Sequence, residues 1–138
     1  MIRVLTVGVF DLLHIGHVLL FQHIKELYGK NCCLTVAVQD GDYIHKYKPE
    51  AKMVYNTEER IYMVKSVRYV DDVVVYKDVD KDIQNLEFDV FVKGPDQNHE
   101  GFRRAEEWCM HHGKEVATIQ RTGGISSTMI AKFTVESR

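Results

Sequence analysis

The stretch that decides the fold is Gly8-Val9-Phe10-Asp11-Leu12-Leu13-His14-Ile15-Gly16-His17. The apolar run before it, Ile2–Val7, is typical of a buried strand. After it, Val18–Phe21, Ile24 and Leu27 recur at a spacing that predicts a helix with one buried face. The stretch therefore marks a strand-to-helix turn. Free backbone N–H groups beside two imidazoles favour an anion there, such as the phosphate of a group-transfer reaction.

Two simpler interpretations of the histidines stay open at this point. A histidine near a helix start is usually a cap or a packing residue, and a His-x-x-His pair is half of a common zinc site. Gly16 gives a ligand room to approach the backbone. Together with Gly8, Phe10 and Asp11 in fixed order, the pair forms a much narrower pattern than either simpler interpretation requires.

Length and composition indicate one domain, residues 1–138, with a single core. The sequence is 45% hydrophobic and 28% charged, as in soluble globular proteins. A net charge of −2, with both signs interspersed, predicts no nucleic-acid partner. No run is apolar enough for membrane insertion, and we expect no signal peptide. Three cysteines, two of them adjacent, favour the reducing cytoplasm over a disulfide framework.

Strand and helix patterns alternate along the chain. The expected strands are Ile2–Val7, Leu34–Val38, Val73–Tyr76, Val90–Val92 and Val116–Ile119. The expected helices are His17–Tyr28, Thr57–Val67, Asp80–Leu86, Glu100–His112 and Ser126–Phe133. This alternation predicts an α/β fold, a Rossmann-like three-layer sandwich with a five-stranded parallel sheet. Ligands of such sheets bind beyond the carboxyl ends of the strands, where the strand order reverses.

The longest irregular piece expected is Asp40–Asn56, a length typical of a functional loop. Its lysines are ordinary surface charges on general grounds. The functional alternative is that Lys48, with Lys46 as second choice, folds over phosphates like a lid. Thr57 is the expected N-cap of the helix that follows.

These motifs resemble those of the cytidylyltransferase family, whose HxGH signature matches GVFDLLHIGH here. Thr57–Arg60 and Val67–Asp71 resemble a second motif of that family. Near the end of the sequence, Arg121-Thr122-Gly123-Gly124-Ile125-Ser126-Ser127-Thr128 closely resembles the family's RTxGIST signature. The resemblance covers nearly the whole chain.

The resemblance implies a role for each matching residue. The catalytic residues would be His14, His17, Lys48 and Arg121. The nucleotide-binding residues would be Gly8, Val9, Phe10, Gly16, Arg60, Arg68, Asp96, Thr122, Ile125, Ser126, Ser127 and Thr128. The acceptor-binding residues would be Asp11, Lys46 and Lys48. Ordinary helix pairing stays an alternative for the two arginines of the second motif.

The sequence departs from the family pattern in the turn after the fourth strand. Pro95 stands where an acidic residue is often found, and Gln97-Asn98-His99 replaces a common aromatic residue. Asp96 matches the second acidic residue of that turn, which lies near the metal and the phosphates in the family.

By this resemblance, we expect a homodimeric enzyme that transfers CMP from CTP to a small phosphate monoester. Glycerol 3-phosphate is the expected acceptor, giving CDP-glycerol and pyrophosphate. Mg²⁺ would be carried by the nucleotide, with no metal site built by the protein alone. Phosphoethanolamine or a sugar phosphate as acceptor, adenylyl transfer, and a non-catalytic nucleotide-binding module remain alternatives.

Overall fold

The structure is a computed structural model that describes residues 1–119. Its strands are β1 (Arg3–Gly8), β2 (Cys33–Gln39), β3 (Asp72–Tyr76), β4 (Val90–Lys93) and β5 (Glu115–Thr118). Its helices are α1 (Ile15–Tyr28), α2 (Gly41–Tyr47), α3 (Thr57–Lys65), α4 (Val79–Asp82), the 3₁₀ turn η1 (Ile83–Asn85) and α5 (Glu100–His111). Strands and helices alternate, as the sequence pattern predicts.

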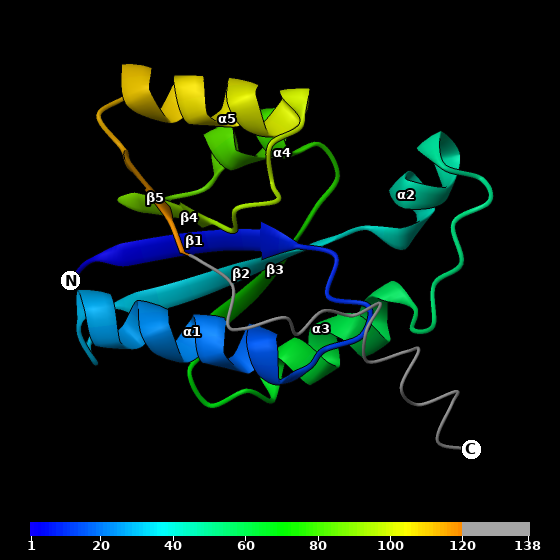
Figure 1. The fold of residues 1–138 in the computed structure, drawn as a ribbon, viewed down its shortest axis with the longest axis horizontal. Helices are drawn as coiled ribbons and strands as arrows, with labels where there is room; N and C mark the ends of the chain where they lie inside the picture. The colour runs from blue at the N-terminus through cyan, green and yellow to red at the C-terminus, as the bar shows by residue number, and fades with distance from the viewer. Residues whose placement is uncertain (120–138) are drawn as a thin grey trace.

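The five strands form one parallel sheet in the order β3-β2-β1-β4-β5. Helices α1 and α3 cover one face of the sheet, and α4 and α5 cover the other (Figure 1). The predicted Rossmann-like three-layer sandwich is therefore confirmed. Because the strand order reverses between β1 and β4, the carboxyl ends of these two strands form the topological switch point.

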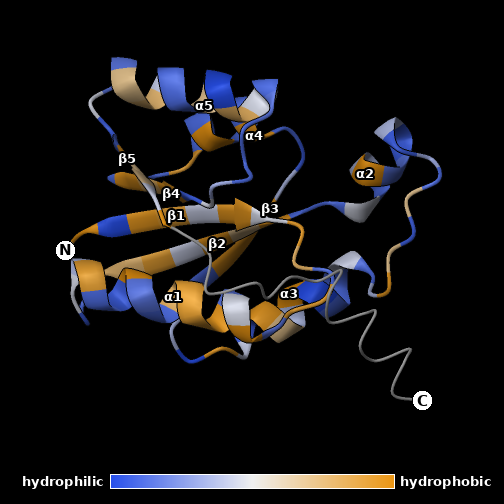
Figure 2. Cartoon of the chain, viewed as in Figure 1, coloured by the Kyte–Doolittle hydropathy of each residue, from blue (hydrophilic) through white to orange (hydrophobic). Residues whose placement is uncertain are grey.

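Where a single core was expected, the sheet separates the buried residues into two apolar clusters, one on each face. Figure 2 shows β1 and β2 coloured mostly as hydrophobic. Under α1 and α3, the buried residues include Val4, Leu34, Val36, Phe21, Ile24 and Val64. Under α4 and α5, they include Leu5, Val7, Ala37, Phe91, Phe102 and Cys109. Burial on both faces explains why β1 and β2 are almost continuously hydrophobic.

Helix α1 begins two residues earlier than predicted, at Ile15, because the side chain of His14 serves as its N-cap. The segment 40–56 was expected to be irregular, but its residues 41–47 form helix α2. The side chain of Asp40 caps this helix by accepting a hydrogen bond from the N–H of Tyr43 (3.1 Å). These two caps place both helix starts at the carboxyl edge of the sheet.

The prediction that Thr57 is the N-cap of α3 is wrong, because Asn56 takes that position. Asn56 Oδ1 accepts from the N–H of Glu59 (2.8 Å), and Glu59 Oε1 accepts from the N–H of Asn56 (3.0 Å). This reciprocal capping box leaves the Thr57 hydroxyl for other partners. The helix expected at Asp80–Leu86 is divided between α4 and η1, and the one expected at Ser126–Phe133 lies outside the described residues.

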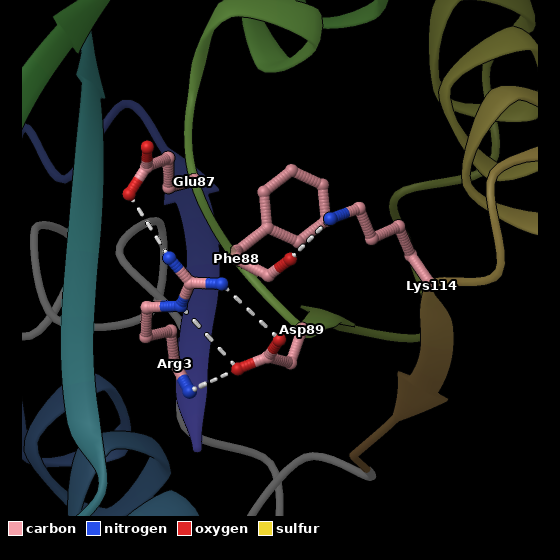
Figure 3. A network of polar contacts seen from close by, with 5 residues as sticks. All are labelled: Arg3, Glu87, Phe88, Asp89 and Lys114. Carbon is pink, nitrogen blue, oxygen red and sulfur yellow. Dashed lines mark hydrogen bonds and ion pairs between the residues drawn. The ribbon is translucent and has the colours of Figure 1, made fainter. Parts of the chain in front are cut away.

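The amino edge of the sheet is held by the ion pairs of Arg3 (Figure 3). The backbone N–H of Arg3 donates to Asp89 Oδ2 (2.8 Å), and its guanidinium contacts both Asp89 (3.4 Å) and Glu87 (3.0 Å). Nearby, Lys114 Nζ donates to the carbonyl of Phe88 (2.8 Å). The hydrogen bonds from the backbone and side chain of Arg3 lower the pKa of Asp89.

We predict that Asp89→Asn lowers the free energy of unfolding at pH 7. The free energy of unfolding of this variant should also fall less steeply than that of wild type as the pH is lowered. Because the folded state lowers the pKa of Asp89, its contribution is present above the unfolded-state value of about 3.9. The contribution is lost as the pH falls through the folded-state pKa. Urea unfolding between pH 7 and pH 3 measures both effects, with Asp72→Asn, an exposed acid at the start of β3, as the control. Identical acid dependence in wild type and Asp89→Asn would contradict this account.

Candidate active site

The two histidines of the opening motif cap helix α1 reciprocally. His14 Nδ1 accepts from the N–H of Gly16 (3.0 Å), and His17 Nδ1 accepts from the N–H of His14 (3.2 Å). The rings stack with their centroids 3.9 Å apart. Because each Nδ1 is an acceptor, the proton of each neutral imidazole lies on Nε2. The cap therefore selects, in both rings, the tautomer whose donor is Nε2–H.

The buried side chain of Phe10 packs against the histidine turn. Its side chain is buried, and its ring meets the ring of His17 edge-on at 5.2 Å between centroids. The backbone of Phe10 has a φ of +54°, a left-handed conformation that is strained for a bulky residue. A Cβ at Gly8 would lie 2.8 Å from the Phe10 ring. Only glycine at position 8 therefore admits Phe10 in this conformation without rearrangement.

Arg60 of α3 is fully buried and binds the segments that leave β1 and β2. Its Nη1 donates to the backbone carbonyls of Val9 (2.9 Å) and Gln39 (2.8 Å). Its Nε donates to the carbonyl of Tyr55 (3.3 Å), and its Nη2 donates to the hydroxyl of Thr57 (3.1 Å). The guanidinium thereby joins the ends of two neighbouring strands to the start of α3.

The surroundings of Arg60 partly offset the cost of burying its charge. Burial lowers the pKa of Arg60, and the carboxylates of Asp11 and Asp40 act in the opposite direction. Thr57 Oγ1 also accepts from the N–H of Gly41 (2.8 Å), which ties the start of α2 to the same cluster. A Cβ at Gly41 would lie 2.9 Å from that hydroxyl oxygen, so the close approach requires glycine.

Asp11 connects the histidine turn to the end of segment 40–56. Its two carboxylate oxygens accept from the backbone N–H groups of Val54 and Tyr55, each at 2.9 Å. The neighbouring Arg60 contacts Val9 and Tyr55, so the two segments are joined twice. This positioning contact was not predicted from the sequence. The acceptor-binding role of Asp11 stays a prediction.

The two loop lysines lie at the end of α2. Lys46 is exposed in the last turn of the helix, with Nζ 5.6 Å from the centre of the Tyr47 ring. Lys48 is the exposed C-cap residue, and its backbone N–H donates to the carbonyl of Ile44 (2.8 Å). Both lysines thus follow the carboxyl end of β2. Their assignment to phosphates or acceptor remains a prediction.

Arg68 lies beyond the end of α3, in the connection to β3. Its Nη2 donates to the hydroxyl of Tyr69 (2.9 Å), and its guanidinium lies 5.0 Å from the centre of that ring. Arg68 precedes the amino end of β3, whereas the histidines follow the carboxyl end of β1. Its contact with nucleotide stays a prediction.

The turn after β4 presents Asp96 at the switch point. Asp96 is exposed, between Pro95 and Gln97. Gln97 closes the turn: its Oε1 accepts from the N–H of Gly94 (3.0 Å), and its Nε2 donates to the carbonyl of Val7 (2.9 Å). Sequence reasoning assigned Gln97 no role, although its replacement of an aromatic residue was a signal that could have singled it out.

The remaining predicted site residues lie outside the described residues 1–119. They are Arg121, Thr122, Ile125, Ser126, Ser127 and Thr128. The last described residue, Ile119, donates its N–H to the carbonyl of Lys93 (3.0 Å) at the carboxyl end of β4. The described chain thus ends at the same edge of the sheet as the histidine turn.

Residues 1–119 contain no group of three His, Cys, Asp or Glu side chains arranged to hold a metal ion. The zinc-site interpretation of the histidine pair therefore gains no third ligand from this part of the chain. Within the same range, no helix combines the length and apolar character needed to cross a membrane.

The strand order and the helices on both faces of the sheet define an α/β domain of the Rossmann-like class, with the histidine turn at its switch point. More specifically, the chain belongs to the family described as cytidylyltransferase-like, whose model matches residues 5–133. It is therefore a nucleotidyltransferase. The family expected from the sequence motifs is confirmed.

Known proteins of two activities are similar to the chain over most of its length. It is 36% identical over 131 residues to glycerol-3-phosphate cytidylyltransferase of Staphylococcus aureus, covering 93% of this chain and 91% of that one. It is 33% identical over 122 residues to FAD synthase of Aciduliprofundum boonei, covering 87% and 78%. A lipopolysaccharide core biosynthesis protein from Thermoplasma volcanium shares the fold, with a TM-score of 0.72, 22% identity and coverage of 88% and 98%.

Substitutions at His14 separate its capping role from its chemistry. We predict that His14→Asn keeps the cap, because an amide oxygen can accept from the N–H of Gly16, but removes the Nε2–H donor. His14→Ala removes both and costs about 1 kcal/mol of stability. Both variants should lose roughly 100- to 1,000-fold in turnover, the effect of removing one donor to a developing negative charge.

Chemical denaturation and pyrophosphate release measure the two effects separately. The prediction fails if His14→Asn is as stable as wild type and also turns over at the wild-type rate. That result would mean that the His14 side chain caps α1 but does not contribute to turnover.

Proposed function

We propose that the protein transfers CMP from CTP to glycerol 3-phosphate, forming CDP-glycerol and releasing pyrophosphate. The observation that carries the proposal is the reciprocal histidine cap at the switch point, which puts two Nε2–H donors on stacked rings. The similarity to the Staphylococcus aureus glycerol-3-phosphate cytidylyltransferase supports the choice of nucleotide and acceptor. We assign the activity to one domain, residues 1–138.

The proposed reaction is an in-line displacement at the α-phosphorus of CTP. An oxygen of the acceptor phosphate forms the new P–O bond. The bond to the bridging oxygen of the β-phosphate breaks, and that oxygen leaves with the electron pair as part of pyrophosphate. His14 and His17 donate Nε2–H to oxygens of the α-phosphate as negative charge accumulates. No side chain becomes covalently modified.

Cationic side chains complete the proposed site. Lys48 and Arg121 neutralise phosphate charge, and Lys46 assists at the acceptor. Arg60 acts through the backbone that it fixes: its bond to the Val9 carbonyl holds the turn between β1 and the histidines. Buried as it is, Arg60 shapes the nucleotide site instead of reaching into solvent.

Mg²⁺ fits the site as an ion held mainly by the nucleotide and water. Asp96 offers an exposed carboxylate at the switch point, the oxygen donor that Mg²⁺ prefers. Asp11 is less suitable, because both of its oxygens accept backbone N–H groups. When bound, Mg²⁺ would neutralise triphosphate charge. We further propose a homodimer that works in the reducing cytoplasm, where the free thiols of Cys32, Cys33 and Cys109 would persist.

A second candidate function is adenylyl transfer, as in forming FAD from ATP and FMN. The observation that favours it is the similarity to FAD synthases, which is nearly as high as that to the cytidylyltransferase. The same histidine geometry would serve this reaction, because the displacement at the α-phosphorus is chemically identical. The base and the acceptor distinguish the two candidates.

A matrix of substrates tests the proposal. CTP and ATP are each combined with Mg²⁺ and glycerol 3-phosphate, phosphoethanolamine, a sugar phosphate or FMN. Pyrophosphate release is followed, and products are identified by mass spectrometry. We expect CTP with glycerol 3-phosphate to give CDP-glycerol with a kcat/KM at least about tenfold above every other pair, a difference of about 1.4 kcal/mol in transition-state binding.

Two results would overturn the proposal in different ways. Formation of FAD from ATP and FMN without CDP-glycerol would establish the second candidate. Binding of CTP without pyrophosphate release in the presence of any acceptor would indicate a non-catalytic nucleotide-binding module.

A further inference from the structure

At the switch point, the backbone pairing of β1 with β4 ends and a side-chain hydrogen bond follows it. Paired residues run from Val4↔Val90 to Thr6↔Val92, and no register pair follows among the described residues. The Thr6 hydroxyl reinforces the last pair by donating to the carbonyl of Val92 (3.0 Å). The next carbonyl of β1, that of Val7, accepts instead from Gln97 Nε2 (2.9 Å). A side-chain amide thus continues the connection where the strands stop pairing.

The nitrogen of the Gln97 amide donates a hydrogen bond to one segment, and its oxygen accepts one from another. Its Nε2 donates to β1, and its Oε1 accepts from the N–H of Gly94 (3.0 Å). The backbone N–H of Gln97 also donates to the carbonyl of Gly94 (3.2 Å), closing the turn. Only a primary amide of this length both donates and accepts in this way, because a carboxylate accepts only and a thioether lacks the donor.

The two hydrogen bonds of the Gln97 amide help to position Asp96. Asp96 is enclosed in the turn between Gly94 and Gln97, and the turn is fastened to Val7, the residue before Gly8 of the histidine motif. The Gln97 amide therefore joins the Asp96 turn directly to the start of the histidine motif, beyond the last paired residues of β1 and β4. The other contacts printed within this turn, from the Gln97 N–H to the Gly94 carbonyl and from the Asn98 amide to the Pro95 carbonyl, do not reach β1.

We propose that Gln97 is a positioning residue for nucleotide binding, whose amide fastens the β4 turn to β1 and thereby holds Asp96 across the switch point from the histidines. The inference rests on the proposed function, in which Asp96 lies beside the Mg²⁺–triphosphate. Gln97 acts through Asp96, so its loss weakens the binding of Mg²⁺–CTP and leaves the histidine chemistry unchanged.

The test is a double-mutant cycle of Gln97→Met and Asp96→Asn, read out by titration calorimetry of Mg²⁺–CTP and by kinetics. Gln97→Met should raise the Kd and the KM for CTP about tenfold, with kcat changed less than twofold. In the Asp96→Asn background, the same substitution should change the Kd less than twofold, because the residue it positions is already lost. Gln97→Glu, which retains an acceptor for Gly94 but not the donor to Val7, should resemble Gln97→Met.

Gln84→Met is the matched control. Gln84 also donates its amide to a backbone carbonyl, that of Asp80 (2.9 Å), but it lies in η1, outside the switch point. Its Kd and kinetics should equal those of wild type. Thermal unfolding of every variant identifies losses due to unfolding, and Gln97→Glu repeats the test if Gln97→Met is unfolded at the assay temperature.

The outcomes separate this inference from the proposed function. An unchanged Kd for Mg²⁺–CTP in Gln97→Met and Gln97→Glu, or fully additive effects in the cycle, overturns the positioning role. A wild type that binds Mg²⁺–CTP but releases no pyrophosphate with any acceptor overturns the proposed function alone, because the calorimetric cycle does not depend on turnover.

Discussion

A buried guanidinium is the constraint on which the active edge of this molecule depends. Burying a charge without partners is costly, so Arg60 must find acceptors inside the protein. The carbonyls that it binds, those of Val9 and Gln39, lie where β1 and β2 end, and backbone carbonyls at such positions need partners of their own. One side chain thus satisfies two strand ends and fixes the start of α3 against them.

Other contacts extend this arrangement along the same edge of the sheet. The Thr57 hydroxyl brings the start of α2 to Arg60, and Asp11 fastens the end of segment 40–56 to the histidine turn. In each case, a side chain binds backbone groups of a different segment. Loops that would otherwise move independently are therefore held in fixed relation to the histidines, as transfer chemistry based on positioned donors requires.

The fold could be predicted from the sequence because burial on both faces of the sheet leaves a strong hydrophobic pattern in the strands. Each end of the five strands was predicted to within one residue. Helix α2 was missed because it is short and its apolar positions are few. Thr57 was predicted as the N-cap instead of Asn56 because both residue types commonly cap helices. Glu59, three residues after Asn56, completes a capping box with Asn56 and was the signal that distinguishes the two.

The histidine turn was located by its motif, but its hydrogen bonds could not be inferred. The partners of Arg60 and Asp11 are backbone groups, whose positions depend on the fold and not on residue type. An arginine that resembles a nucleotide ligand in sequence is therefore, in the structure, bound to carbonyls. All of the assigned site roles stay predictions, both those of residues in the described part of the chain and those of residues 120–138.

The central claim is that the stacked, capped histidines present their Nε2–H groups to the reacting phosphate. A crystal structure of the protein with CTP and Mg²⁺ tests it most directly. The account predicts oxygens of the α-phosphate at about 3 Å from Nε2 of His14 and His17, with both Nδ1 atoms still accepting the N–H groups of the cap. A triphosphate bound away from these rings, or rings turned so that Nδ1 contacts the phosphate, would contradict it.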